Sequence, residues 1–293
     1  MTAIPTNNAP FVWKIKDLPG NPTETPEVTA AKARDLGFSS LLVKVANGTG
    51  SYNWRKHPDG TYTDDLIQPF ADACEAEGID LWAWAYYYGS NPAAEAKMAA
   101  KRMKDYPCLK GLIIDAEGEC KAPGKTAANT YMRTLRAGYT GPLGLTSFRW
   151  PSLHPDFPWA SFIGKIDFLV PQVYWVKAAN PAQQLDRCVL EHYDLHKQLG
   201  KTMVPIIPAG AAYHDNENHW QPTVAQMQEF SARAQKLDLP GVSWWEWANA
   251  ERYHLTAGMS WVPTTPPPPA IPDLPTRVAR LEAWAMTQGY PGP

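Results

Sequence analysis

Short, nearly continuous hydrophobic runs recur along the chain and alternate with amphipathic segments of helical periodicity. Uninterrupted apolar runs predict strands that are covered on both faces. Eight such strands are expected, at residues 11–15, 40–48, 80–88, 111–115, 142–148, 167–175, 202–210 and 241–248. Helical patterns, each ending near a glycine or proline, are clearest at residues 26–37, 64–78, 93–106 and 223–237.

The order of these elements predicts an α/β protein with a (β/α)8 barrel of the TIM type. Strand centres are about 26 to 40 residues apart, the length of one strand–helix unit, and eight right-handed units close into a barrel. An open, doubly wound sheet is the alternative. No GxGxxG fingerprint opens any of the helices, so the commonest signature of that alternative is missing.

The composition changes abruptly after Trp261. The segment VPTTPPPPAIPDLP is typical of a semi-rigid polyproline linker, which cannot join a barrel core. We therefore predict three parts: a barrel over residues 1–262, a Pro-rich linker over 263–275 and a short helix within 276–293.

The C-terminal segment carries one apolar seam. Val278, Leu281 and Ala285 occupy a, d and a positions of a heptad, and Trp284 lies beside them. A single helix of this length is marginal alone. It is expected to form homo-oligomers or to dock on a partner, and the alternative is a frayed helix that rests on the barrel.

Charge and hydropathy exclude several classes of protein. The chain has 27 Lys and Arg against 29 Asp and Glu, a net charge of −2, so we expect no nucleic-acid partner. No apolar run is long enough to span a membrane, and the N-terminus has no signal-peptide pattern. We expect synthesis in the cytoplasm. The four cysteines form no CxxC pair and are expected to be buried thiols.

Two acids follow the fourth predicted strand in the stretch GLIIDAEGEC. Strand side chains alternate, so Asp115 and Glu117 project to the same side, with Cα atoms roughly 6.5 to 7 Å apart. In a barrel this position is the mouth, where chemistry takes place. Repulsion and partial burial are expected to raise one pKa, making Glu117 a proton donor to a glycosidic oxygen while charged Asp115 stabilises an electron-poor intermediate. The alternative is two structural acids at a strand end.

Other strand ends supply rings, amides and charges. The chain has thirteen Trp and thirteen Tyr, and flat rings pack against sugar faces while polar groups bind the hydroxyls. Each single ring could equally belong to the core. The substrate-binding candidates are Lys44, Asn47, Tyr86, Tyr88, Gln172, Tyr174, Trp175, Trp245 and Trp247.

A third candidate acid is Glu246, because a charge within SWWEW must find a partner or a substrate. Metal and cofactor sites are not expected. His192 and His196 have a spacing that can chelate a metal, but no third ligand is evident and a packed pair is the favoured interpretation.

The order of these motifs resembles that of the family 25 glycoside hydrolases, the lysozyme-type muramidases common in phage endolysins. LLVKVANGTGSYNW is similar to the second-strand segment of that family, DLWAWAYYYG to its third strand and GLIIDAE to its fourth-strand DxE. The resemblance implies that Glu117 is the general acid and that Asp115 assists the N-acetyl group of the substrate. The acids that the family carries on its first strand and near its sixth are absent from FVWKI and PQVYW, and Glu246 or Asp215 could substitute. The layout is also similar to that of family 18 chitinases, without their DxxDxDxE series.

Two functions remain open at this point. The first is a glycosidase that cleaves peptidoglycan or a related N-acetylated polysaccharide. The second is a non-catalytic carbohydrate-binding or structural barrel, such as a component of a phage virion or tail. The lack of a signal-peptide pattern suits a phage protein or one that is released by lysis.

Overall fold

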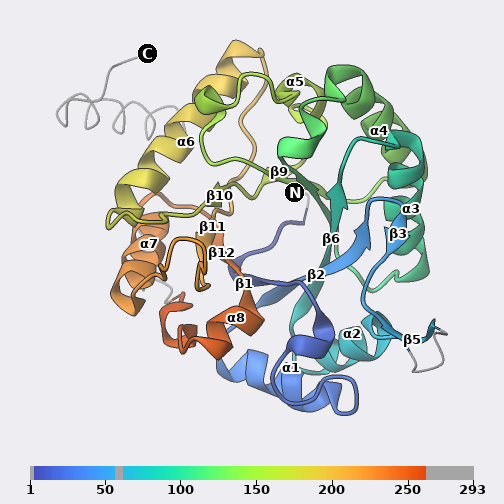
Figure 1. Ribbon diagram of the computed structural model, residues 1–293, viewed down its shortest axis with the longest axis vertical. Coiled ribbons are helices and arrows are strands. Elements are labelled where there is room, and N and C mark those ends of the chain that lie inside the picture. The colour runs from blue at the N-terminus through green and yellow to red at the C-terminus, as the bar shows by residue number, and fades with distance from the viewer. Residues whose placement is uncertain (1–2, 57–61, 262–293) are drawn as a thin grey trace.

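Parallel strands form the centre of the molecule and helices surround them, which confirms the (β/α)8 barrel (Figure 1). The computed structural model describes residues 3–56 and 62–261. Within them, the barrel consists of β1 (Asn7–Val12), β2 (Ser40–Asn47), β6 (Asp80–Tyr87), β7 (Leu112–Ala116), β8 (Leu143–Thr146), β9 (Phe168–Leu169) with β10 (Gln172–Val173), β11 (Ala209–Ala211) and β12 (Gly241–Trp245).

The ring of strands closes at the sixth barrel strand, which consists of β9 and β10. The sheet order is β10-β11-β12-β1-β2-β6-β7-β8-β9, and β9 and β10 are two halves of one barrel strand. Leu169 also bridges Ile206 in parallel, and Phe148 bridges Gln172, so each half contacts the strands on both sides.

The helices cover the outside of the ring and confirm the four predicted helical patterns to within three residues at either end (Figure 1). Pro92 and Pro181 begin two of them, because the fixed φ of proline suits the first helical turn. The helices are α1 (Pro26–Asp35), α2 (Ile67–Ala76), α3 (Pro92–Asp105), α4 (Gly124–Gly138), α5 (Trp159–Phe162), α6 (Pro181–Gln198), α7 (Val224–Lys236) and α8 (Trp247–Arg252).

Four strands differ from the predicted ranges by three residues or more. The first strand lies at Asn7–Val12, not at 11–15, because residues 7–10 pair with β12 and Phe11 and Val12 pair with β2. The last strand ends at Trp245, not at 248, because α8 begins at Trp247. The predicted strand 167–175 is divided at Pro171, and the predicted strand 202–210 is reduced to Ala209–Ala211 after Pro208. Proline has no N–H to give to a sheet, so regular pairing stops at these residues.

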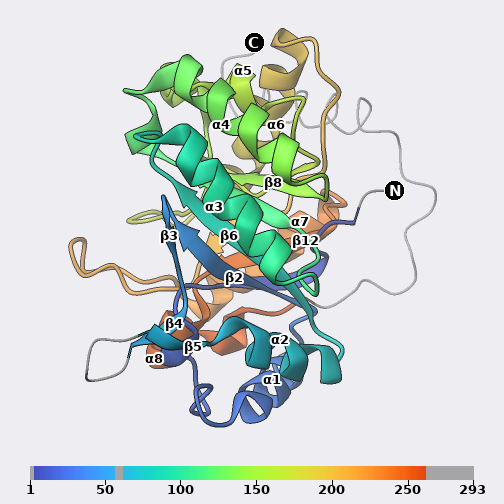
Figure 2. The same cartoon turned by 90° about the vertical axis from the view of Figure 1, so that its right-hand side faces the viewer.

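A side excursion leaves the barrel after β2 (Figure 2). It contains β3 (Gly50–Ser51), which runs antiparallel to the end of β2, and the pair β4 (Trp54–Lys56) and β5 (Tyr62–Asp65). The Asn53 side chain accepts from the Ile15 N–H at 2.8 Å and donates to the Lys44 carbonyl at 2.7 Å. This buried amide therefore ties the excursion to the segments that follow β1 and to β2 itself.

Aromatic rings fill the floor of the barrel. Trp82 and Phe168 meet edge to face with centroids 5.6 Å apart. A Cβ atom at Gly144 would lie 2.3 Å from the Phe168 ring, and one at Gly111 would lie 2.3 Å from the Trp82 ring. The glycines therefore make room for large rings at the bottom of the barrel.

The predicted linker 263–275 and the predicted helix within 276–293 lie outside the described residues. Among residues 3–56 and 62–261, no helix has both the length and the apolar character needed to cross a membrane.

Candidate functional site

Asp115 and Glu117 lie at the carboxyl end of β7 and share one neighbour. The Gln172 amide on β10 donates to Glu117 Oε1 at 2.7 Å and is 3.5 Å from Asp115 Oδ1. Asp115 is only 3% exposed, whereas Glu117 is half-buried. We call these two acids the carboxylate pair. Strand alternation thus places both at one site, with Asp115 deeper and Glu117 nearer solvent.

Burial acts on the deeper member of the carboxylate pair. It raises the pKa of Asp115 well above its ordinary value, and the negative charge of Glu117 raises it further. Asp115 therefore keeps its proton to a higher pH than an ordinary aspartate does. The sequence analysis expects a charged Asp115 and a raised pKa on Glu117.

Lys44 places a positive charge beside the carboxylate pair. Its Nζ atom lies 4.6 Å from the ring centroids of Tyr52 and Trp84, 5.4 Å from that of Tyr86 and 6.0 Å from that of Trp13. Burial lowers the pKa of Lys44 to about 8, although both carboxylates oppose this change. The rings replace part of the water that an ammonium group loses on burial. Lys44 is therefore a cation held by aromatic faces on one side and acids on the other.

Replacing Lys44 by methionine is expected to raise the pH at which Asp115 loses its proton. The Lys44 charge lowers the pKa of Asp115, and methionine removes that charge while filling similar space. The difference from the wild type should shrink as the pH rises through about 8, where Lys44 itself loses its proton. Carboxyl ¹³C NMR titration checks this, with exposed Lys16→Met as the matched control. A titration of Asp115 that is unchanged or moves to lower pH would contradict it.

Tyr86, Tyr88 and Asn47 form one side of the mouth. The two tyrosine rings lie 4.7 Å apart, and the Asn47 amide donates to the Tyr88 hydroxyl at 3.0 Å. The Tyr86 hydroxyl donates to Glu119 Oε2 at 2.8 Å. Across the barrel, Tyr174 is half-buried, and its burial, followed by the charge of Glu117, raises its pKa. All four residues were predicted from the sequence as substrate-binding residues, and that role stays a prediction.

Trp245 joins this aromatic wall together with two residues that sequence reasoning missed. Its ring contacts Trp84 edge to face at 5.6 Å and lies 6.3 Å from Trp13. Trp13 is 40% exposed and offers a flat face to solvent. Trp13 was assigned to the interior of a strand, so its exposure was not expected. The available signal was Pro10 and the polar residues after Trp13, which shift the first strand towards the N-terminus.

Trp175 and Trp247 are not part of the mouth, which corrects their assignment as substrate-binding residues. Both are fully buried in the core between the barrel and its outer helices. Trp175 follows Tyr174, which borders the mouth, and adjacent positions of an extended chain face opposite sides. The sequence analysis places Tyr174 and Trp175 on the same surface.

Glu246 caps the N-terminus of α8. It accepts from the Asn249 backbone N–H at 3.0 Å and from the Asn249 side chain at 2.5 Å. Carboxylates at a helix N-terminus are stabilised by its unpaired N–H groups. The other possible substitute, Asp215, accepts from the Asn218 N–H within a turn at 3.0 Å. Both acids therefore have local partners, and a catalytic role for either stays a prediction.

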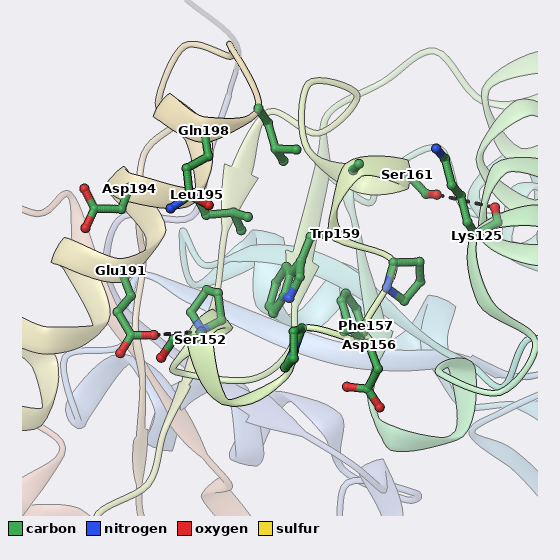
Figure 3. Close-up of a pocket in the computed structure, with 15 residues that line it drawn as sticks. Lys125, Ser152, Asp156, Phe157, Trp159, Ser161, Glu191, Asp194, Leu195 and Gln198 are labelled. Atoms are coloured by element: carbon green, nitrogen blue, oxygen red, sulfur yellow. Dashed lines mark hydrogen bonds between the residues drawn. The ribbon is translucent and has the colours of Figure 1, made fainter. Parts of the chain in front are cut away.

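A separate pocket of about 630 Å³ lies on the outer surface between α5 and α6 (Figure 3). Trp159 and Phe157 form its floor, and Glu191 accepts from the Ser152 N–H at 2.9 Å on its rim. None of its lining residues belongs to the carboxylate pair or its neighbours. This pocket is therefore distinct from the mouth of the barrel.

In the described part of the chain, no group of three or more His, Cys, Asp or Glu side chains is arranged to hold a metal ion. His192 and His196 are buried on α6, and the His192 ring packs edge to face against Trp159 at 5.7 Å. Burial lowers the pKa of His192 to about 3, so this ring is neutral. The pair is part of the helix packing.

Comparison with solved structures finds similar barrels among polysaccharide-degrading enzymes. A family 18 chitinase from Pseudoalteromonas aurantia superposes with a TM-score of 0.58 at 14% identity, over 86% of this chain and 97% of that one. A class V chitinase from Nicotiana tobaccum gives 0.60 at 9% identity, over 87% and 97%. The endo-1,4-β-D-mannanase of Thermotoga petrophila gives 0.58 at 10% identity, over 82% and 88%.

These comparisons correct the resemblance to family 25. The similar structures are family 18 chitinases and mannanase or endoglucanase barrels, not family 25 lysozymes, and no family model matches the chain. No curated protein matches it in sequence either. A Lys on a second strand and a DxE after a fourth strand are short patterns, and barrels of different families can share them. At these identities the similarity establishes that the chain has the (β/α)8 fold of those enzymes.

Proposed function

We propose that this protein is a glycoside hydrolase that cleaves an N-acetylated polysaccharide, such as peptidoglycan or a related glycan. The observation that carries the proposal is the carboxylate pair, held by one glutamine at the aromatic mouth of the barrel. Such a mouth fits a chain of sugars, since rings stack on sugar faces and the acids act on the bond between them. The similar barrels with chitinase, mannanase and endoglucanase titles support this class of reaction.

In the proposed reaction Glu117 is the general acid. It is the more exposed member of the pair, so it can approach the glycosidic oxygen of a bound glycan. The pair shares one proton, which Asp115 keeps to a higher pH than an ordinary aspartate does, and in this proposal the proton passes to Glu117 when a glycan binds. Glu117 then protonates the leaving oxygen as the bond to the anomeric carbon breaks.

Asp115 has the complementary role. Once it has passed on the shared proton, its carboxylate stabilises the positive charge that develops on the sugar. The acetamido oxygen of the substrate forms the new bond to the anomeric carbon, giving a cyclic intermediate. Water, deprotonated by Glu117, then opens this ring and restores the proton to the carboxylate pair. Two displacements at one carbon return its original configuration.

The requirement for an N-acetyl group gives a direct test. We expect release of reducing ends from an N-acetylated β-linked oligosaccharide or from purified peptidoglycan, with retained configuration in ¹H NMR of the first product. The matched de-N-acetylated oligosaccharide should not be cleaved, because it lacks the internal nucleophile. Equal cleavage of both substrates would reject this mechanism. Binding of both without any product would favour a non-catalytic carbohydrate-binding barrel.

A further inference from the structure

Next to the mouth, the side excursion and the segment after β1 enclose a second pocket, of about 710 Å³. Its polar wall consists mainly of donors. Lys14 and Lys16 lie on one side, and Tyr52 and Trp54 lie on the other. The Trp54 indole N–H is buried and not open to solvent, so Trp54 contributes its ring to the wall and the two lysines contribute the charge.

The positive charge of this pocket is only weakly compensated. Lys14 Nζ is 3.9 Å from Asp17 Oδ2, the outer limit of an ion pair, and both side chains are more than one-third exposed. The same ammonium lies 4.7 Å from the Trp13 ring. Lys16 is exposed at the pocket edge. Two cations with one weak counter-charge favour an anion.

The pocket adjoins the carboxylate pair through shared walls. The Tyr52 ring lines the pocket and is also one of the rings that contact Lys44. The Trp13 ring lies between the two lysines, 4.7 Å from Lys14 Nζ and 6.0 Å from Lys44 Nζ. The charge of Lys14 contributes to lowering the pKa of Lys44, which also places the two close together. A ligand at the mouth can therefore reach the pocket across one aromatic side chain.

Buried side chains behind the pocket fix the position of its walls. The buried Asn53 side chain ties the pocket wall to the Ile15 N–H and to the Lys44 carbonyl. Arg102, which is 2% exposed, lies with its guanidinium 5.4 Å from the Trp54 ring and donates to Asp65 at 2.9 Å. Because these partners are buried, the walls of the pocket are preformed.

We propose that this pocket is a subsite for an anionic substituent, a carboxylate or a phosphate, on a glycan whose backbone lies across the carboxylate pair. This inference rests on the proposed function and specifies the substrate class of the enzyme, which is an acidic polysaccharide in preference to a neutral one. The ammonium groups of Lys14 and Lys16 bind the substituent, and Trp13 stacks on the sugar that carries it.

Binding to the full-length protein tests the subsite without any need for hydrolysis. The probes are a β-linked N-acetylglucosamine tetrasaccharide with lactyl carboxylates on alternate sugars, the same molecule with its carboxyls amidated, and a counterpart with phosphate monoesters. Calorimetry should show that wild-type protein binds at least one acidic probe about tenfold more tightly than the amidated one, a difference of about 1.4 kcal/mol. The preference should weaken with added salt.

The double variant Lys14→Gln/Lys16→Gln should lose this preference and keep its affinity for the amidated probe. The matched control is Lys197→Gln/Lys236→Gln, which removes two exposed charges near the C-terminal ends of α6 and α7. Equal wild-type affinity for all three probes, or equal loss in the control, would overturn the subsite. Failure of the proposed hydrolysis would appear separately, as binding without reducing ends.

Discussion

Glu117→Gln is expected to reduce the release of reducing ends by about 10² to 10⁴-fold, the usual contribution of a general acid. Glutamine has nearly the same shape and can keep a hydrogen bond with Gln172, but it cannot give a proton to the leaving oxygen. Binding of the oligosaccharide should change little, so the loss should appear in kcat. Steady-state assays on an N-acetylated oligosaccharide measure this directly.

The matched control for this variant is Glu119→Gln. Glu119 is an exposed acid two residues further along, and its carboxylate accepts from the Tyr86 hydroxyl. Its replacement should leave kcat close to the wild-type value. If Glu117→Gln hydrolyses the glycan as fast as the wild type, the assignment of the general acid is wrong. A second test uses a substrate whose leaving group has a low pKa, such as nitrophenol. This leaving group needs no protonation, so the Glu117→Gln variant should regain much of its lost rate on that substrate.

Asp115→Asn is expected to lower kcat by about 10² to 10³-fold, as the loss of a preorganised electrostatic partner usually does, and to raise the melting temperature at neutral pH. The first effect follows because asparagine can neither pass on the shared proton nor stabilise positive charge. The second follows because the folded-state pKa of Asp115 is raised. Ionised Asp115 therefore disfavours the folded state, a cost that is absent at low pH and grows as the pH rises from the unfolded pKa to the folded pKa. Asparagine removes that cost.

Thermal unfolding at two pH values distinguishes the removal of this ionisation cost from a general effect of the substitution on stability. The stabilisation should be present at neutral pH and should disappear at a pH below the ordinary pKa of aspartate, where the wild-type carboxyl is protonated in both states. Asp17→Asn, an exposed acid outside the barrel mouth, should show neither effect. Unchanged kcat together with a lower melting temperature at neutral pH would show that Asp115 is a structural residue.

The barrel could be predicted from the sequence because its signal is repeated eight times. Errors in single strands did not change the overall assignment. The errors that did occur have two causes. Proline interrupts pairing without interrupting hydrophobicity, as at Pro171 and Pro208. The first strand was misplaced because its pairing with β12 is a contact between chain ends.

The site was predicted less completely because hydrophobicity does not distinguish the two faces of a strand end. Asp115 and Glu117 were placed correctly by alternation. The same rule, applied within PQVYW, would have separated Tyr174 from Trp175. The role of Glu246 as a helix cap could not be predicted without knowing that α8 begins at the next residue. The donor-lined pocket could not be predicted at all, because Lys14, Tyr52 and Trp54 come together only through the buried contacts of Asn53 and Arg102.

The glycines beneath the site constrain how the binding cavity can change among relatives. Phe168 occupies the space that a side chain at Gly144 would need, and Trp82 does the same at Gly111. Shortening either ring alone leaves a void, and adding a side chain at either glycine alone produces a steric clash. We therefore expect these positions to covary in homologous sequences, so that deeper or shallower cavities arise by exchange of volume between two strands.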